Sequence, residues 1–179
     1  PYEVPVPVIT SVKESGDYIV VTGSIDTMAV ATIELFYTDQ TDQTATELVS
    51  SFSTEEDGSF EYRITKNKYQ GRRSVGFTAT ATYDNKITSD LSKVTYLKEK
   101  EIDLTLLNYY VKENGTGDGS SWDKAMSPQS FAYTLPRIGD GVTFYVAEGT
   151  YYPVYDYNMN RANGKDATFT VNSDVTIKG

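Results

Sequence analysis

The sequence contains no cysteine and no histidine among its 179 residues. Their absence excludes disulfide bonds, zinc sites built from Cys and His, and Ser-His-Asp or Cys-His catalysis. Any acid–base chemistry must therefore come from Asp, Glu, Lys, Arg or Tyr side chains. The sequence also has no apolar run of about 18 residues, so we expect no membrane insertion.

Positive charge is scarce, because 16 Lys and Arg stand against 25 Asp and Glu and give a formal net charge of −9. Nucleic acids bind to clusters of basic side chains that neutralise their phosphates. An acidic chain repels them, so we expect no nucleic-acid partner. The content of 39% hydrophobic and 23% charged residues is typical of a folded globular protein.

Short segments of alternating polarity, separated by polar or glycine-containing turns, fill the first half of the chain. The clearest is Val75–Tyr83, in which every odd residue is apolar or aromatic and most even residues are Thr. This alternation predicts a strand with one buried face and one solvated face. The other predicted strands are Val8–Val12, Tyr18–Gly23, Ala31–Tyr37, Leu48–Ser53, Ser59–Ile64 and Thr88–Tyr96. Seven short strands in about ninety residues predict a β-sandwich of the immunoglobulin-like (Ig-like) kind over residues 1–97.

The pattern changes after residue 97. Closely spaced charges predict a linker over 98–108, and residues 109–179 then read as strand, helix, strand, long loop and two short strands. Ser127 and Pro128 mark the helix start, because Ser is a favoured N-cap and Pro fits the first helical position. The predicted strands of this region are Tyr109–Val111, Val142–Val146, Phe169–Val171 and Val175–Ile177.

Two families share short blocks with these regions. The blocks Ile33–Tyr37, Glu56–Phe60 and Thr78–Thr82, in that order, resemble bacterial extracellular Ig-like modules. In that family such modules are spacers or binding platforms on secreted and surface proteins. The resemblance covers residues 8–97 and implies an extracellular or cell-surface location in a bacterium.

The second region is similar to the opening of right-handed parallel β-helix proteins of the pectin-lyase-like kind. The blocks that carry the resemblance are Tyr110–Val111, Gly117–Trp122, Gly139–Gly141, Phe144–Ala147, Gly149–Tyr151 and Val175–Gly179. It implies that the helix caps the open end of the coil and that the strand with Phe144 begins the first rung. The fold class is then all-β: an Ig-like β-sandwich followed by the helix-capped start of a right-handed parallel β-helix.

A β-helix buries the apolar face of each coil on the next, so one coil alone is not expected to be stable. We therefore expect these residues to belong to a longer protein. Two alternatives stay open for residues 109–179. The region closes differently, as a small sheet with one helix, or it completes itself against another chain.

Aromatic side chains are the main candidates for ligand binding. Four of the 15 tyrosines, Tyr151, Tyr152, Tyr155 and Tyr157, crowd one long loop, and the single Trp122 lies in a glycine-rich loop. Tyr and Trp combine an apolar ring with a polar tip, which suits sugar rings and protein partners. The competing interpretation is that these rings pack the cap of the coil. The glycine-rich loop itself has Ser120 where a dinucleotide-binding fingerprint requires Gly, which excludes that reading.

Two weak calcium candidates complete the set of sites, and the sequence implies no other cofactor. Asp156, Asn158 and Asn160 have the 1-3-5 spacing of a calcium loop, but Gly and Glu are missing from its sixth and twelfth positions. Asp118 and Asp123, beside Gly117 and Gly119, are the second candidate. We expect Asx turns at both places rather than bound metal.

No sequence spacing points to a pair of catalytic carboxylates, so no catalytic residue is assigned. The first hypothesis is a non-catalytic part of a bacterial surface or secreted protein, with a role in adhesion or carbohydrate binding and with a glycan or protein as its ligand. The alternative is the N-terminal part of a β-helix polysaccharide lyase or glycoside hydrolase with its active site beyond Gly179.

Overall fold

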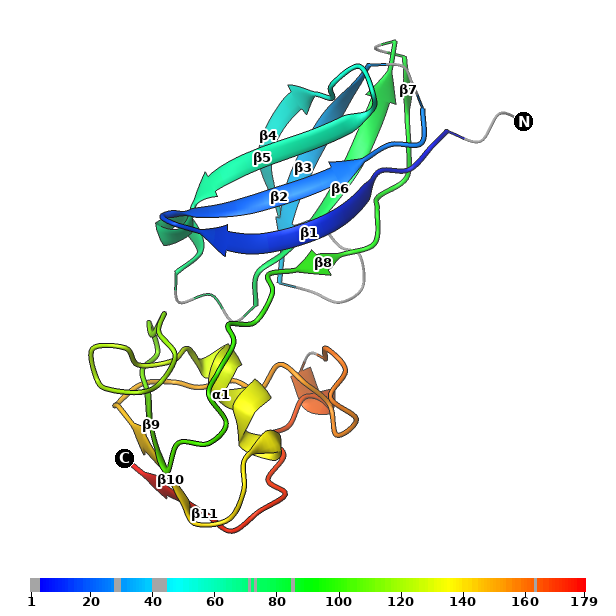
Figure 1. Ribbon diagram of the computed structural model, residues 1–179. Helices are drawn as coiled ribbons and strands as arrows, with labels where there is room; N and C mark the ends of the chain where they lie inside the picture. Colours follow the sequence, from blue (N-terminus) through cyan, green and yellow to red (C-terminus); the bar gives the residue numbers. More distant parts are fainter. Residues whose placement is uncertain are drawn as a thin grey trace. The chain divides into compact units, whose positions relative to one another are not determined.

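We analysed a computed structural model, which describes residues 4–27, 30–39, 45–70, 72, 74–84, 86–162 and 164–179 (Figure 1). The protein is mostly β-strand, arranged in several open sheets. It divides into two compact units, Pro1–Lys98 and Glu99–Gly179. Each unit has its own buried core, so we describe the two separately.

The first unit contains two antiparallel sheets. One sheet has the order β1-β2-β5, and the other has the order β4-β3-β6-β7 with β8 also paired to β6. The strands are β1 (Val8–Ser15), β2 (Tyr18–Ser24), β3 (Ala31–Thr38), β4 (Glu47–Ser53), β5 (Ser59–Thr65), β6 (Gly76–Tyr83), β7 (Ile87–Thr88) and β8 (Thr95–Tyr96). A short 3₁₀ turn, η1 (Lys66–Tyr69), follows β5.

The inner faces of both sheets contribute to one core. Alternate residues of β3 and β6 are almost fully buried, as their sequence pattern predicted, and Ile19 and Val21 come from the opposite sheet. Tyr37 lies in this core, where its hydroxyl donates to the Ser74 carbonyl at 3.0 Å and its ring stacks on Tyr69. The pleat thus places one row of side chains inward on each sheet.

The prediction of a seventh continuous strand over Thr88–Tyr96 is wrong. Only β7 and β8 are strands, and the residues between them are held to β6 by the backbone amides and the side chains of two serines. The Oγ atoms of Ser89 and Ser92 accept hydrogen bonds from the Ala81 and Ala79 amides, both at 3.0 Å. This segment also buries Thr78, whose face of β6 was expected to be solvated.

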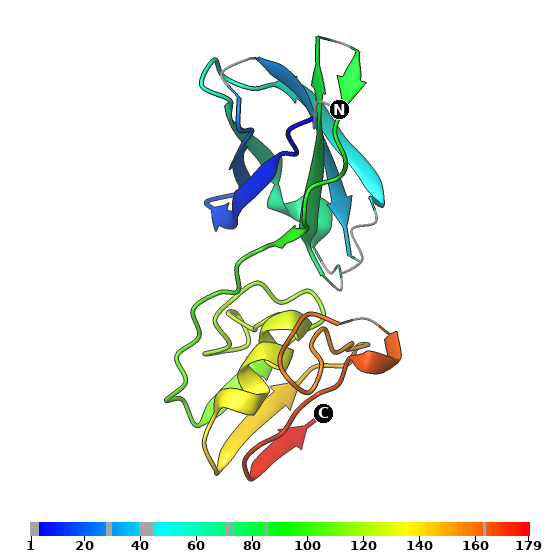
Figure 2. The same ribbon diagram turned by 90° about the vertical axis from the view of Figure 1, so that its right-hand side faces the viewer.

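The second unit is built on a three-stranded parallel sheet with the order β11-β10-β9 (Figure 2). Its elements are β9 (Asn108–Val111), α1 (Pro128–Thr134), η2 (Leu135–Arg137), β10 (Val142–Val146), η3 (Gly164–Asp166) and β11 (Val175–Lys178). Phe144 is in register with Tyr109 on one side and with Ile177 on the other. Strands that follow one another along the chain are therefore neighbours in the sheet.

Helix α1 packs on one face of this sheet. The predicted start is confirmed, because the Ser130 amide donates to the Ser127 hydroxyl at 3.0 Å and Pro128 is the first helical residue. Phe131 meets Phe144 edge to face at 5.0 Å between ring centroids. The helix gives way to the 3₁₀ turn η2 at Leu135, next to Pro136, which cannot continue the hydrogen-bond ladder.

Two segments of this unit complete its core without regular structure. Phe169–Val171 is not the predicted strand; the Phe169 ring instead packs 5.5 Å from Phe131. Residues 99–107 belong to the second unit, where Ile102 is buried against the same core.

Candidate binding site

The tyrosine-rich loop contains a compact hairpin over residues 155–161, which we call the Tyr157 hairpin. Tyr155 and Arg161 form an antiparallel bridge at its base, and the Asp156 amide donates to the Asn160 carbonyl at 2.8 Å. Met159 adopts a φ of 64°, a left-handed conformation that bulky residues rarely adopt. The surroundings therefore hold the tip of the hairpin in one shape.

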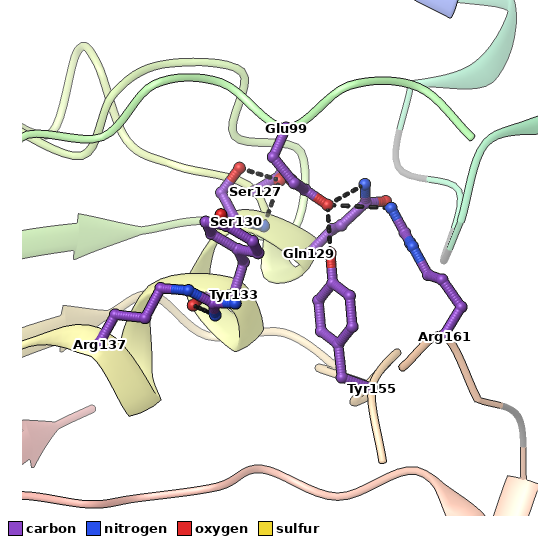
Figure 3. Close-up of polar contacts among 8 residues, drawn as sticks. All are labelled: Glu99, Ser127, Gln129, Ser130, Tyr133, Arg137, Tyr155 and Arg161. Atoms are coloured by element: carbon purple, nitrogen blue, oxygen red, sulfur yellow. Dashed lines mark hydrogen bonds and ion pairs between the residues drawn. The ribbon is translucent and has the colours of Figure 1, made fainter. Parts of the chain in front are cut away.

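The base of the hairpin is anchored by the carboxylate of Glu99 (Figure 3). One oxygen, Oε1, accepts hydrogen bonds from the Tyr155 hydroxyl at 2.7 Å, from Gln129 of α1 at 2.5 Å and from the Arg161 guanidinium at 3.0 Å. The side chains of Glu99 and Arg161 are only 14% and 16% exposed. Water therefore competes poorly for these charge-assisted bonds.

Apolar contacts reinforce this anchor. Val154 and Tyr155 are buried against Ala132 of α1, and the Tyr155 ring lies 6.1 Å from that of Tyr133. Burial raises the pKa of the Tyr155 hydroxyl far above its ordinary value, and the negative charge of Glu99 raises it further. Tyr155 is thus a neutral hydrogen-bond donor in the folded protein.

The structure divides the four loop tyrosines into two pairs. Tyr155 is buried, and Tyr151 packs on the core while its hydroxyl donates to the Ala147 carbonyl at 2.8 Å. Tyr157 at the tip is 79% exposed and Tyr152 is 55% exposed. Only Tyr152 and Tyr157 therefore present most of their ring surface to a ligand.

Trp122 lies apart from the hairpin, in the glycine-rich loop beside β9. It is 42% exposed and meets the Tyr110 ring edge to face at 5.1 Å. The glycines of this loop allow a close approach of two backbone segments. A Cβ atom on Gly115 or Gly117 would lie 2.1 Å from a carbonyl oxygen of the neighbouring segment. This packing gives the glycines a structural role.

One aspartate of each calcium candidate is used in a turn. The Asp118 carboxylate accepts from the Ser120 amide at 3.0 Å and from the Ser120 hydroxyl at 2.7 Å. The Asp156 carboxylate accepts from the Asn160 amide at 2.9 Å. These hydrogen bonds lower the pKa values of both aspartates. Within the described ranges, no three Asp, Glu, His or Cys side chains gather where they could hold one metal ion.

Sequence reasoning missed the residue that organises the hairpin. Glu99 lies in a charged segment that the sequence predicts to be a linker, and its three hydrogen-bond partners are 30 to 62 positions away in the chain. No local pattern links a carboxylate to donors at such separations. Tyr110 and Tyr145 were likewise not singled out, although their rings stack on neighbouring strands.

No family model, curated protein or solved structure matches this chain. In the part of the chain that the structure describes, no helix has the length and apolar character needed to cross a membrane.

Proposed function

We propose that the chain is a non-catalytic part of a bacterial surface or secreted protein, and that it binds carbohydrate through exposed aromatic side chains. The observation that carries the proposal is the Tyr157 hairpin. It exposes Tyr157, while buried contacts of Glu99 and Tyr155 fix its base. Tyr152, just before the hairpin in the chain, is also exposed. A fixed hairpin loses little conformational entropy when a ligand binds, which favours affinity.

We further propose that the first unit is an Ig-like module and the second the start of a right-handed parallel β-helix. Support for the first comes from two antiparallel sheets that share one core. Support for the second comes from three parallel strands whose residues Tyr109, Phe144 and Ile177 form one row. Ile177 is 52% exposed at the end of this row, whereas Tyr109 and Phe144 are fully buried, which is the pattern expected where a further coil would pack.

The test is a glycan array probed with the intact chain, followed by titration of the best ligand into variants. We expect the double variant Tyr152→Ala with Tyr157→Ala to weaken binding by at least about tenfold, because exposed aromatic anchors typically dominate recognition. Tyr18→Ala is the matched control, since Tyr18 is 41% exposed and lies in the first unit.

Three outcomes would overturn the proposal. Equal affinity of the double variant and the wild type would remove the hairpin as the binding site. Binding to no glycan on the array would remove carbohydrate as the ligand class. Cleavage of a polysaccharide by the purified chain would contradict a non-catalytic role.

A further inference from the structure

The two sheets of the first unit have four edge strands, and three of these carry features that hinder further pairing. β1 has a bulge, and the Val12 carbonyl on its open side accepts a hydrogen bond from the Lys98 amide at 2.9 Å. The register of β4 skips Val49, which makes a bulge there, and β7 is only two residues long. Bulges, short strands and covered edges are the usual protection of a sheet against pairing with another chain.

The fourth edge strand, β5, shows none of these features among the described residues. It is the outermost strand of the β1-β2-β5 sheet (Figure 1). Its pairing with β2 is regular over all seven residues, and its sequence contains no Pro, Gly or Lys. A regular and unprotected edge of this length is a template on which another strand can pair.

The backbone groups of Glu61 and Arg63 point to the open side of β5. Just before the strand begins, the Ile25 amide donates to the Gly58 carbonyl at 3.0 Å and so continues the register of β2 and β5. Hydrogen-bonded and non-hydrogen-bonded pairs alternate along an antiparallel ladder, so the even-numbered residues of β5 bond to β2. The odd-numbered residues therefore turn their amides and carbonyls outward. No described residue forms a backbone hydrogen bond with Glu61 or Arg63 on that side.

The sequence of β5 is complementary to itself. Two copies that pair antiparallel about Tyr62 place polar residues opposite polar ones, apolar opposite apolar, and an acid opposite a base. The resulting pairs are Ser59 with Thr65, Phe60 with Ile64, and Glu61 with Arg63. This register pairs odd-numbered residues with odd-numbered ones, so the outward amides and carbonyls of both copies meet. Residues directly opposite each other have Cβ atoms about 4.5–5.5 Å apart, close enough for the two charges to attract.

Apolar surface at the same edge would gain cover from such a pairing. The rings of Phe52 on β4 and Tyr62 on β5 stack 4.9 Å apart, and both side chains are partly exposed. Tyr62 lies at the centre of the register, where it meets its own copy. Removal of this aromatic surface from water would add to the stability of the pairing.

We propose that β5 pairs antiparallel with β5 of a second copy of the chain, in a symmetric dimer centred on Tyr62. The two three-stranded sheets then join into one sheet of six strands. The interface is isologous, so the pairing closes at two copies. The match of charge, polarity and hydrogen-bond phase within one strand favours a second copy over an unrelated peptide. β11 of the second unit is also an unpaired edge, but Val175–Lys178 carries only one charge, a lysine, and is not complementary to itself in this way.

Sedimentation equilibrium of the intact chain tests the dimer. We expect the mass to rise from 19.9 kDa toward twice that value as the concentration increases to about 0.5 mM, a range that detects weak dimers, and expect added salt to weaken the association. Arg63→Glu places carboxylates opposite one another and should weaken the dimer at least about tenfold. Lys86→Glu is the matched control, because it makes the same charge change at an exposed residue between β6 and β7 and should leave the dimer unchanged.

A mixture of two variants separates pairing from folding. Glu61→Arg and Arg63→Glu each bring like charges together in their own homodimer, so each alone should be largely monomeric. In an equal mixture, the bases of one variant lie opposite the acids of the other, and heterodimers should form. A variant that had simply failed to fold would not be rescued by its partner.

Three results would overturn the inference. The first is a wild-type chain that stays monomeric over the whole concentration range. The second is a dimer that Arg63→Glu leaves intact, because the interface would then lie elsewhere, for example at β11. The third is an equal mixture of the two variants that stays monomeric. None of these results bears on carbohydrate binding by the Tyr157 hairpin, which the dimer does not require.

Discussion

Replacement of Glu99 by Ala removes the acceptor that joins three parts of the second unit. The Tyr155 hydroxyl, the Gln129 amide and the Arg161 guanidinium would all lose their bond to Oε1. Ala offers no acceptor, and all three donors point at the same carboxylate oxygen (Figure 3). The variant therefore removes the carboxylate that a nearly buried cation and a buried hydroxyl both contact.

The expected cost follows from burial. Breaking a buried ion pair by removing one member typically costs about 3–5 kcal/mol. Glu99 and Arg161 retain 14% and 16% exposure, so some water can reach the guanidinium, and we take the lower end, about 3 kcal/mol. For a unit of about 80 residues this corresponds to a fall in Tm of about 12–24 °C.

The chain provides its own probe for this measurement. Trp122 is the only tryptophan and lies in the second unit, so its fluorescence follows the unfolding of that unit. Glu101→Ala is the matched control, since Glu101 is an exposed carboxylate two residues away, and its change should stay within about 0.5 kcal/mol. Glu99→Gln keeps an acceptor oxygen without the charge and should fall between the two.

The reasoning is refuted if Glu99→Ala and Glu101→Ala unfold at the same temperature by Trp122 fluorescence. It is also refuted if Glu99→Gln is as destabilised as Glu99→Ala, because the hydrogen bonds would then contribute nothing beyond the charge.

Two further predictions concern backbone packing and pH. Gly117→Ala should destabilise the second unit by at least about 2 kcal/mol in thermal unfolding, because its Cβ would lie 2.1 Å from the Lys124 carbonyl oxygen. Gly139→Ala is the control and should be nearly neutral, because a Cβ there meets nothing within 4 Å. Burial raises the pKa values of Tyr37, Tyr109 and Tyr155 above the ordinary value. Their contribution to stability is complete below about pH 10 and is lost as the pH rises, by up to about 1.4 kcal/mol per pH unit for each tyrosine. The measurement is a pH titration that follows tyrosinate absorbance and unfolding together. Complete ionisation of the tyrosines at a pH below that of unfolding would contradict the prediction.

Much of the fold follows from local signals in the sequence. Alternation in β3, β6 and β10 identified the residues that face each core, because a strand has a fixed period of two. The start of α1 was equally readable, since Ser127 and Pro128 act on backbone groups within one turn. Such signals depend on neighbours along the chain and need no knowledge of the rest of the molecule.

Other elements depend on contacts between distant residues. The segment after β7 reads as a strand, but Ser89 and Ser92 replace part of its backbone pairing with side-chain bonds to β6. Phe169 has the polarity of a strand residue, but it contributes to two cores as part of an irregular segment. Polarity indicated that Phe169 packs inward, but not that Ser89 and Ser92 are buried. In both segments, the backbone conformation depends on the partner that covers it.

In the candidate sites, too, local sequence signals predicted some features and long-range contacts decided others. The sequence identified the aromatic loop by its composition, but Tyr151, Tyr152, Tyr155 and Tyr157 are chemically identical side chains. Their roles differ because Glu99 and the Ala147 carbonyl accept hydrogen bonds from two of them and leave the other two largely in solvent. Composition can name the residue types that bind a ligand. Which of those residues remain exposed is set by long-range packing, since burial depends on segments that are remote in the chain and adjacent in space.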